Sequence, residues 1–221
     1  MSIQTVDTSD FSEEWANAAT HALGLLGAIA GSAIVMTAAA GRGGTWQIVG
    51  CAVYATTLIA VYTASTLSHM VRRSRLRDAM RAADQALIFL FIAGSYTPIA
   101  LGWLRAKPWW LLHVLIWGTA LAGFLSKIAF SHRVKLGSVS TTIYMILGWL
   151  PMAAFFPMLA AIPGQLMFWI VAGGLCYMAG IVFFCYDCRI RYFHAAWHLL
   201  VIAGSACHYI GIFRYCTGAS V

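Results

Sequence analysis

The sequence has little charge. Only 10% of its 221 residues are charged, and just seven are Asp or Glu. A soluble domain carries about a quarter charged residues, so a chain with 61% hydrophobic residues lacks the side chains to cover a surface that faces water. The few charges stand in short segments between long apolar runs. This pattern excludes an ordinary soluble domain and predicts an all-α integral membrane protein, because a helix satisfies its own backbone groups in lipid.

Other features are also missing. Residues 1–20 are acidic and lack both a basic stretch and an early apolar core, so we expect no cleaved secretory signal. We expect them to form a short cytoplasmic segment before a transmembrane domain at 21–221. Most of the six cysteines lie inside apolar runs, where a thiol behaves as a small hydrophobic group, so no disulfide framework is expected. No nucleic-acid motif accompanies the basic run 72–81, which we expect to meet anionic lipid headgroups.

Seven segments are apolar over the length of about 20 residues that a membrane span needs. The sequence therefore predicts a bundle of seven transmembrane helices. We place the turn between the fifth and sixth spans at Pro163 and Gly164, and we interpret Pro151 and Pro157 as kinks or helix ends. Pro98 is interpreted as a kink in the third span. The predicted spans are His21–Ala40, Trp46–Met70, Asp84–Leu104, Trp109–Phe130, Val139–Met158, Gln165–Tyr186 and His194–Tyr215.

Lysine and arginine are unevenly shared between the two ends of the predicted bundle. Ten lie in the N-terminus and the 2–3, 4–5 and 6–7 connections, and four lie in the other connections and the C-terminus. Connections that stay in the cytoplasm carry the excess of basic residues. We therefore expect a cytoplasmic N-terminus and a C-terminus outside.

Four side chains that suit a metal site fall at one depth in this topology. His194 and His198 are one helical turn apart at the start of the seventh span, about 6 Å in rise and on one face. His69 ends the second span and Asp84 begins the third, both at the same end. Three imidazoles with one open position are the ligand set of catalytic zinc. Asp84 would then lie near a water as a general base, and Ser65, one turn before His69, could hydrogen-bond to that water.

Each of these residues also has an ordinary explanation. His69 could be an interfacial histidine, and Asp84 a helix N-terminal residue favoured by the macrodipole. His194 and His198 could hydrogen-bond to neighbouring helices. The occurrence of all four at one depth favours the metal site, because ionisable groups within a membrane are costly.

Further polar residues carry weaker signals. Glu13, Glu14, Asn17 and His21 recur at about one-turn spacing, and we expect Glu14, Asn17 and His21 to brace the site, with a ligand role as the alternative. His208 lies ten residues beyond His198, about 15 Å along the helix, and is expected to be structural. His113 and His132 are expected to have structural or exposed roles. Cys185 and Cys188 form a single Cys pair, which is a minor alternative for a metal site.

Several segments resemble the hemolysin III group of the progestin and adipoQ receptor family. EEWANAATH at 13–21 is similar to the N-terminal E-x-x-N-x-x-T-H block, and STLSHM at 65–70 to its S-x-x-x-H. DQALIFLFIAGSYTP at 84–98 resembles the aspartate-led third-helix block, and YFHAAWHLLVIAGSACHYIGIF at 192–213 the seventh-helix H-x-x-x-H block.

The resemblance implies seven helices with a cytoplasmic N-terminus. It also implies zinc held by His69, His194 and His198, with Ser65 and Asp84 around a water. Adiponectin receptors of this family are associated with ceramidase activity, and the bacterial branch with cytolysis and membrane lipid homeostasis. The short segment before the first span fits a bacterial inner-membrane setting better than a ligand-responsive receptor.

Three functions follow as hypotheses. The first is a zinc-dependent hydrolase of a lipid amide or ester, with a membrane lipid as its partner. The second is a pore-forming cytolysin, although no polar stripe that would line a wide channel is present. The third is a non-catalytic sensor of membrane state, in which zinc is structural.

Overall fold

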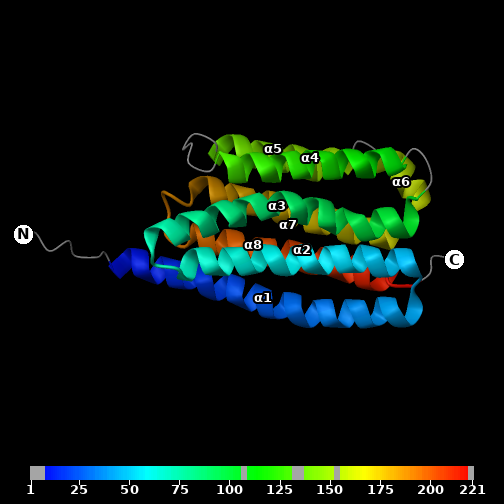
Figure 1. Ribbon diagram of the computed structural model, residues 1–221, viewed down its shortest axis with the longest axis horizontal. Coiled ribbons are helices and arrows are strands. Elements are labelled where there is room, and N and C mark those ends of the chain that lie inside the picture. The colour runs from blue at the N-terminus through cyan, green and yellow to red at the C-terminus, as the bar shows by residue number, and fades with distance from the viewer. Residues whose placement is uncertain (1–7, 106–108, 131–136, 152–154, 219–221) are drawn as a thin grey trace, which may run out of the picture.

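The computed structural model describes residues 8–105, 109–130, 137–151 and 155–218. Over these residues the protein is all-helical, with eight α-helices and no strand. Figure 1 shows them lying side by side, so that the chain runs back and forth along one long axis. The helices are α1 (Thr8–Arg42), α2 (Thr45–Met70), α3 (Ser74–Trp103), α4 (Trp109–Ala129), α5 (Gly137–Trp149), α6 (Phe155–Ala161), α7 (Gly164–Tyr186) and α8 (Phe193–Tyr215).

Six of these helices, α1, α2, α3, α4, α7 and α8, are long and apolar enough to cross a membrane. Their apolar side chains point outward to a large extent. The most apolar stretch of α4 has a mean hydropathy of 1.6, yet only 17% of it is buried within the protein. Leu26 on α1 and Leu111 on α4 are 66% and 72% exposed. Because lipid is the solvent that tolerates such a surface, the chain is a multi-pass membrane protein.

Two helices begin well before the apolar segments that predict them. α1 starts at Thr8 rather than His21, and α3 starts at Ser74 rather than Asp84. The first extension contains Ala and Glu, and the second contains Ala, Arg and Met. These residues favour helix, and the polar side chains among them can be solvated outside the hydrocarbon. The length of the apolar segment therefore predicted only the part of each helix that would lie in lipid, and it missed the polar turns before that part. The expected basic connection after the second span is mostly the first turns of α3.

The predicted fifth span, Val139–Met158, corresponds to two shorter helices. α5 ends at Trp149 and is followed by a 3₁₀ turn over 150–151, and α6 begins at Phe155. Pro157 is the third residue of α6, within the first turn, where a missing N–H costs little. Pro163 is the N-cap of α7, which confirms the predicted turn. α3, in contrast, continues through Pro98.

Close approaches fix the helices that carry the polar residues. α2 packs along both α1 and α3, and α8 packs along both α7 and α1. A Cβ on Gly50 of α2 would come within 2.9 Å of the Pro98 backbone on α3. The start of α1, the end of α2 and the starts of α3 and α8 consequently lie at one end of the bundle, opposite the C-terminal end of α8 (Figure 1).

Candidate metal centre

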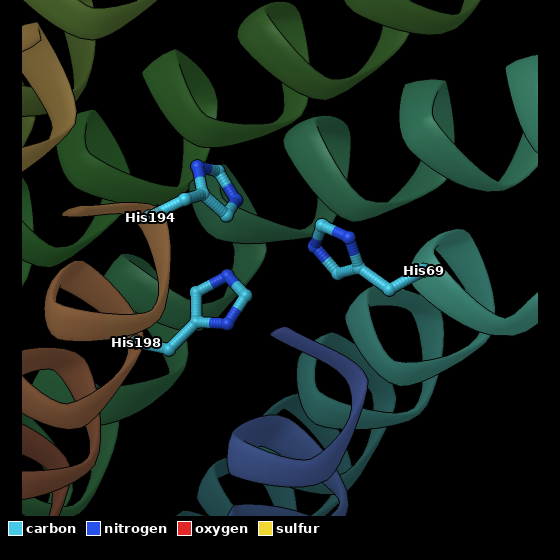
Figure 2. Close-up of side chains that lie close together, drawn as sticks. All are labelled: His69, His194 and His198. Carbon is cyan, nitrogen blue, oxygen red and sulfur yellow. The ribbon is translucent and has the colours of Figure 1, made fainter. Parts of the chain in front are cut away.

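Three histidines from two helices converge at this end of the bundle. His69 lies in the last turn of α2, and His194 and His198 lie in the first turns of α8. Their ring centroids are 5.2 Å (His69 to His194), 5.1 Å (His69 to His198) and 4.5 Å (His194 to His198) apart. One potential ligand atom of each lies within 4.8 Å of the others. Figure 2 shows the three rings facing a common point, as the sequence predicts.

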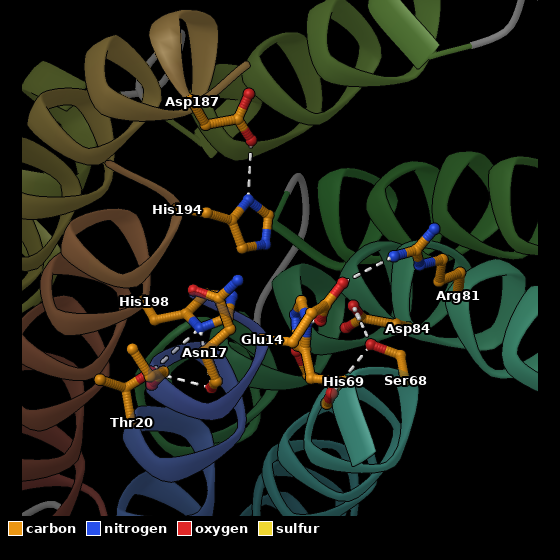
Figure 3. A network of polar contacts seen from close by, with 12 residues as sticks. Glu14, Asn17, Thr20, Ser68, His69, Arg81, Asp84, Asp187, His194 and His198 are labelled. Atoms are coloured by element: carbon orange, nitrogen blue, oxygen red, sulfur yellow. Dashed lines mark hydrogen bonds and ion pairs between the residues drawn. The ribbon is translucent and has the colours of Figure 1, made fainter. Parts of the chain in front are cut away.

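Carboxylates hold two of the three rings from outside. The Nδ1–H of His69 donates to Oε2 of Glu14 at 2.7 Å, and the other oxygen of Glu14 accepts from Arg81 at 3.1 Å. The Nδ1–H of His194 donates to Oδ2 of Asp187 at 2.7 Å (Figure 3). Burial alone would raise the pKa of Asp187, but hydrogen bonds from His194 and Cys188 outweigh it and hold that pKa below its ordinary value.

The third ring is held by α1. Nδ1 of His198 lies 3.2 Å from the carbonyl oxygen of Asn17 and 3.1 Å from Oγ1 of Thr20. The Thr20 hydroxyl itself donates to backbone carbonyls of its own helix, so its oxygen accepts from the imidazole. His198 is only 1% exposed, and these contacts therefore set its orientation.

These contacts decide which nitrogen faces the centre. Because each Nδ1 faces an acceptor, the neutral form of each ring carries its proton on Nδ1 and leaves the lone pair of Nε2 free. Such outer hydrogen bonds fix the tautomer and orientation of histidines that bind metals. Three neutral imidazoles are a ligand set for zinc and related transition metals. The donor set and its outer partners fit a metal ion.

Asp84 lies beside the three convergent histidines rather than among them. Ser65 and Ser68 of α2 present hydroxyl groups to its carboxylate, that of Ser68 at 3.5 Å from Oδ2. Among the described residues the group of convergent ligand atoms contains the three histidines and excludes Asp84. The sequence singled out Ser65 and missed Ser68, one turn further along α2.

The other supporting residues predicted from sequence also reach the site. Glu14 contacts His69, and Asn17 contacts His198 through its carbonyl oxygen. The His21 ring contacts the His198 ring, with the ring centroids 3.6 Å apart and the planes tilted by 38°. Asp187 and Thr20 were missed by sequence reasoning. Thr20 belongs to the E-x-x-N-x-x-T-H block, which was a usable signal, but Asp187 stands in a connection where no periodicity links it to His194.

The connection before α8 is tied to α1. Arg191 donates to Oε1 of Glu13 at 2.9 Å and to Oγ of Ser12 at 3.0 Å. Tyr192, the N-cap of α8, has φ of 62°, a left-handed conformation that is strained for a non-glycine residue. Since His194 follows two residues later, this held conformation fixes where α8 begins and where its first histidine points.

The remaining candidates lie elsewhere. His208 donates from Nε2 to the Ile170 carbonyl at 3.2 Å, which confirms a structural role. His113 is buried on α4 near Tyr96, and His132 lies outside the described residues. Cys185 and Cys188 are exposed free thiols, and within the described part of the chain they belong to no convergent metal-ligating group. All six cysteines are free, as expected.

Comparison with known proteins identifies relatives of this chain. Residues 9–209 match the family described as "Haemolysin-III related". The chain is 34% identical over 204 residues to the "Hemolysin-3 homolog" of Bacillus subtilis (strain 168), covering 92% of this chain and 94% of that protein. It is also 34% identical over 203 residues to "Hemolysin-3" of Bacillus cereus, covering 92% and 91%. It is 31% identical over 212 residues to the human "Monocyte to macrophage differentiation factor", covering 92% and 84%. The chain belongs to the haemolysin-III-related family.

Proposed function

We propose that this protein is a zinc-dependent hydrolase of a membrane lipid amide or ester. The observation that carries the proposal is the shared arrangement of the three imidazoles, each with its Nδ1 held from outside and its Nε2 directed inward. A zinc ion held by His69, His194 and His198 would supply a Lewis acid and would activate water for attack on a carbonyl.

The residues around the centre suit the proton steps of such a reaction. Asp84 offers carboxylate oxygens that can take up a proton beside the three imidazoles, and Ser65 and Ser68 orient that carboxylate. A structural zinc site is usually closed by four protein ligands. Three convergent histidines, with Asp84 outside the convergent group, therefore support a hydrolase over a purely structural centre.

The setting of the site supports a lipid substrate. We propose that α5 and α6 together make a seventh crossing, which accords with the start of α1 and the end of α8 lying at opposite ends (Figure 1). The excess of basic residues at the histidine end supports a cytoplasmic N-terminus. The bacterial relatives support a place in the plasma membrane of a bacterium. A carbonyl reaching the centre would arrive on a lipid of the cytoplasmic leaflet.

Turnover and orientation can be tested separately. Purified, zinc-loaded protein in lipid nanodiscs should release fatty acid from at least one member of a panel of lipid amides and esters. Asp84→Ala should abolish release while retaining zinc. Absence of product above the Asp84→Ala background across the panel would contradict the hydrolase.

The orientation of the bundle is tested by labelling of cysteines. The exposed Cys185 and Cys188 should react with an impermeant maleimide only after cells are permeabilised.

A further inference from the structure

Two side chains of α1 are buried beside the metal centre with polar atoms that have no partner. His21 is 6% exposed and Asn17 is 7% exposed. Within the described residues, the two ring nitrogens of His21 have no hydrogen-bond partner, and Oδ1 of Asn17 has none either. A buried polar atom without a partner destabilises the fold relative to one that is hydrogen-bonded. Filling space does not explain this cost, because Phe and Leu would occupy similar volumes without it.

Both side chains belong to the face of α1 that borders the three histidines. Asn17 and His21 are four residues apart, so they lie above one another on one face of the helix. The His21 ring is 3.6 Å from the His198 ring and 5.1 Å from the Tyr62 ring.

His21 nevertheless differs from the three ligands. It is absent from the convergent group of ligand atoms, and no carboxylate or carbonyl orients either of its nitrogens. In the ligand histidines one nitrogen is held from outside. Because both nitrogens of His21 are free of hydrogen bonds within the described residues, the ring is suited to contact a bound molecule rather than the ion.

We propose that His21 and Asn17 form a hydrogen-bonding subsite that binds the polar group of the lipid beside the metal centre. The imidazole of His21 donates one N–H to an oxygen of that group, and Oδ1 of Asn17 accepts from an N–H or O–H. A carboxamide or a hydroxylated headgroup offers this donor and acceptor pair, whereas a tertiary amide or simple ester lacks the donor. The subsite rests on the proposed function, since both concern the same bound lipid.

A pair of probes isolates the acceptor role of Asn17. Octanamide and N,N-dimethyloctanamide share a chain and a carbonyl oxygen, but only octanamide has N–H donors. Their dissociation constants are obtained from the concentration dependence of the thermal unfolding midpoint of the full-length, zinc-loaded protein in detergent. We expect the wild type to bind octanamide at least about 10-fold more tightly, the effect of leaving one buried acceptor unpaired.

Substitutions locate the preference. Asn17→Leu should reduce the preference to less than about twofold, because the acceptor is removed at similar volume. His21→Phe keeps a ring on His198 but removes the donor, and it should weaken both amides by about 10-fold. His113→Phe is the matched control, since His113 is a buried histidine on α4 whose Nδ1 also lacks a partner. It should leave both constants unchanged.

Zinc content measured in every sample separates the two proposals. Wild-type protein that retains no zinc would contradict the metal centre itself. Zinc-loaded wild type without a preference for octanamide, or the same preference in Asn17→Leu as in wild type, would overturn the subsite while leaving the metal centre intact.

Discussion

The two ends of α8 place histidines in contrasting surroundings. At its start, His194 and His198 donate from Nδ1 to outer acceptors and turn their other nitrogens toward His69. Further along, His208 donates from Nε2 to a backbone carbonyl and lies edge-on to Tyr177 at 5.4 Å. All three are histidines of one apolar helix, yet only the first two share a common point with a third ring.

Different residues surround the two sites. Charged and polar side chains from α1 and the α7–α8 connection hold the rings of the candidate metal centre (Figure 3). Around His208 a glycine provides room, since a Cβ on Gly173 would approach its ring to 2.3 Å. The two environments differ in the ring nitrogen that the outer partner occupies, which is Nδ1 in His194 and His198 and Nε2 in His208. Only the first two rings converge with a third histidine that could hold a metal ion with them.

The largest expected effect is on metal content. His194→Ala removes one of three ligands, so zinc in the purified protein should fall from about one per chain to below about 0.1. Elemental analysis by mass spectrometry after desalting provides the measurement. His208→Ala is the control and should retain zinc. Equal zinc loss in both variants would break the distinction between the two histidine environments.

An outer partner should matter less than a ligand. Asp187→Asn weakens the acceptor that holds His194, and zinc affinity should fall by about 10–100-fold. Competition with a fluorescent chelator measures the affinity. Asp78→Asn, at an exposed carboxylate of α3, should leave the affinity within about twofold of wild type. An unchanged affinity in Asp187→Asn would show that this hydrogen bond does not organise the site.

The packing environment predicts a stability effect without metal loss. Gly173→Ala places a Cβ against His208 and 2.9 Å from the Gly204 carbonyl, and should destabilise the protein by about 1–3 kcal/mol. Gly174→Ala is the neighbouring control, because its Cβ would meet nothing within 4 Å. Thermal unfolding in detergent should show a lower midpoint for the first variant alone, with zinc content equal in both. Similar midpoints would refute the tight fit around His208.

The smallest effect is expected at the surface tie between α1 and the connection before α8. Glu13→Gln removes the exposed ion pair with Arg191, whose side chain is 57% exposed. Such pairs contribute about 0–1 kcal/mol, so the unfolding midpoint and zinc affinity should barely change. A large loss of zinc affinity would mean that this tie, rather than Asp187, positions His194.

The sequence predicted the convergence of the three histidines better than the elements that hold them. His69, His194 and His198 could be brought together because hydropathy located the spans, and because successive spans alternate in direction, so that the end of the second and the start of the seventh lie at the same end. The early start of α1 could not be found from hydropathy, since Glu14 and Asn17 belong to helix outside the apolar stretch. The break between α5 and α6 was only partly predictable. Three prolines mark positions where a helix can end, but the sequence does not decide at which of these positions the helix does end. Asp187 depends on the three-dimensional path of a connection, which no periodicity records.

Zinc K-edge X-ray absorption of the purified protein tests the central claim most directly. A centre built on His69, His194 and His198 predicts bound zinc with three imidazole nitrogens at about 2.0–2.1 Å and no sulfur. Protein that binds no zinc when purified with the ion present, or zinc coordinated by cysteine sulfur, would contradict it.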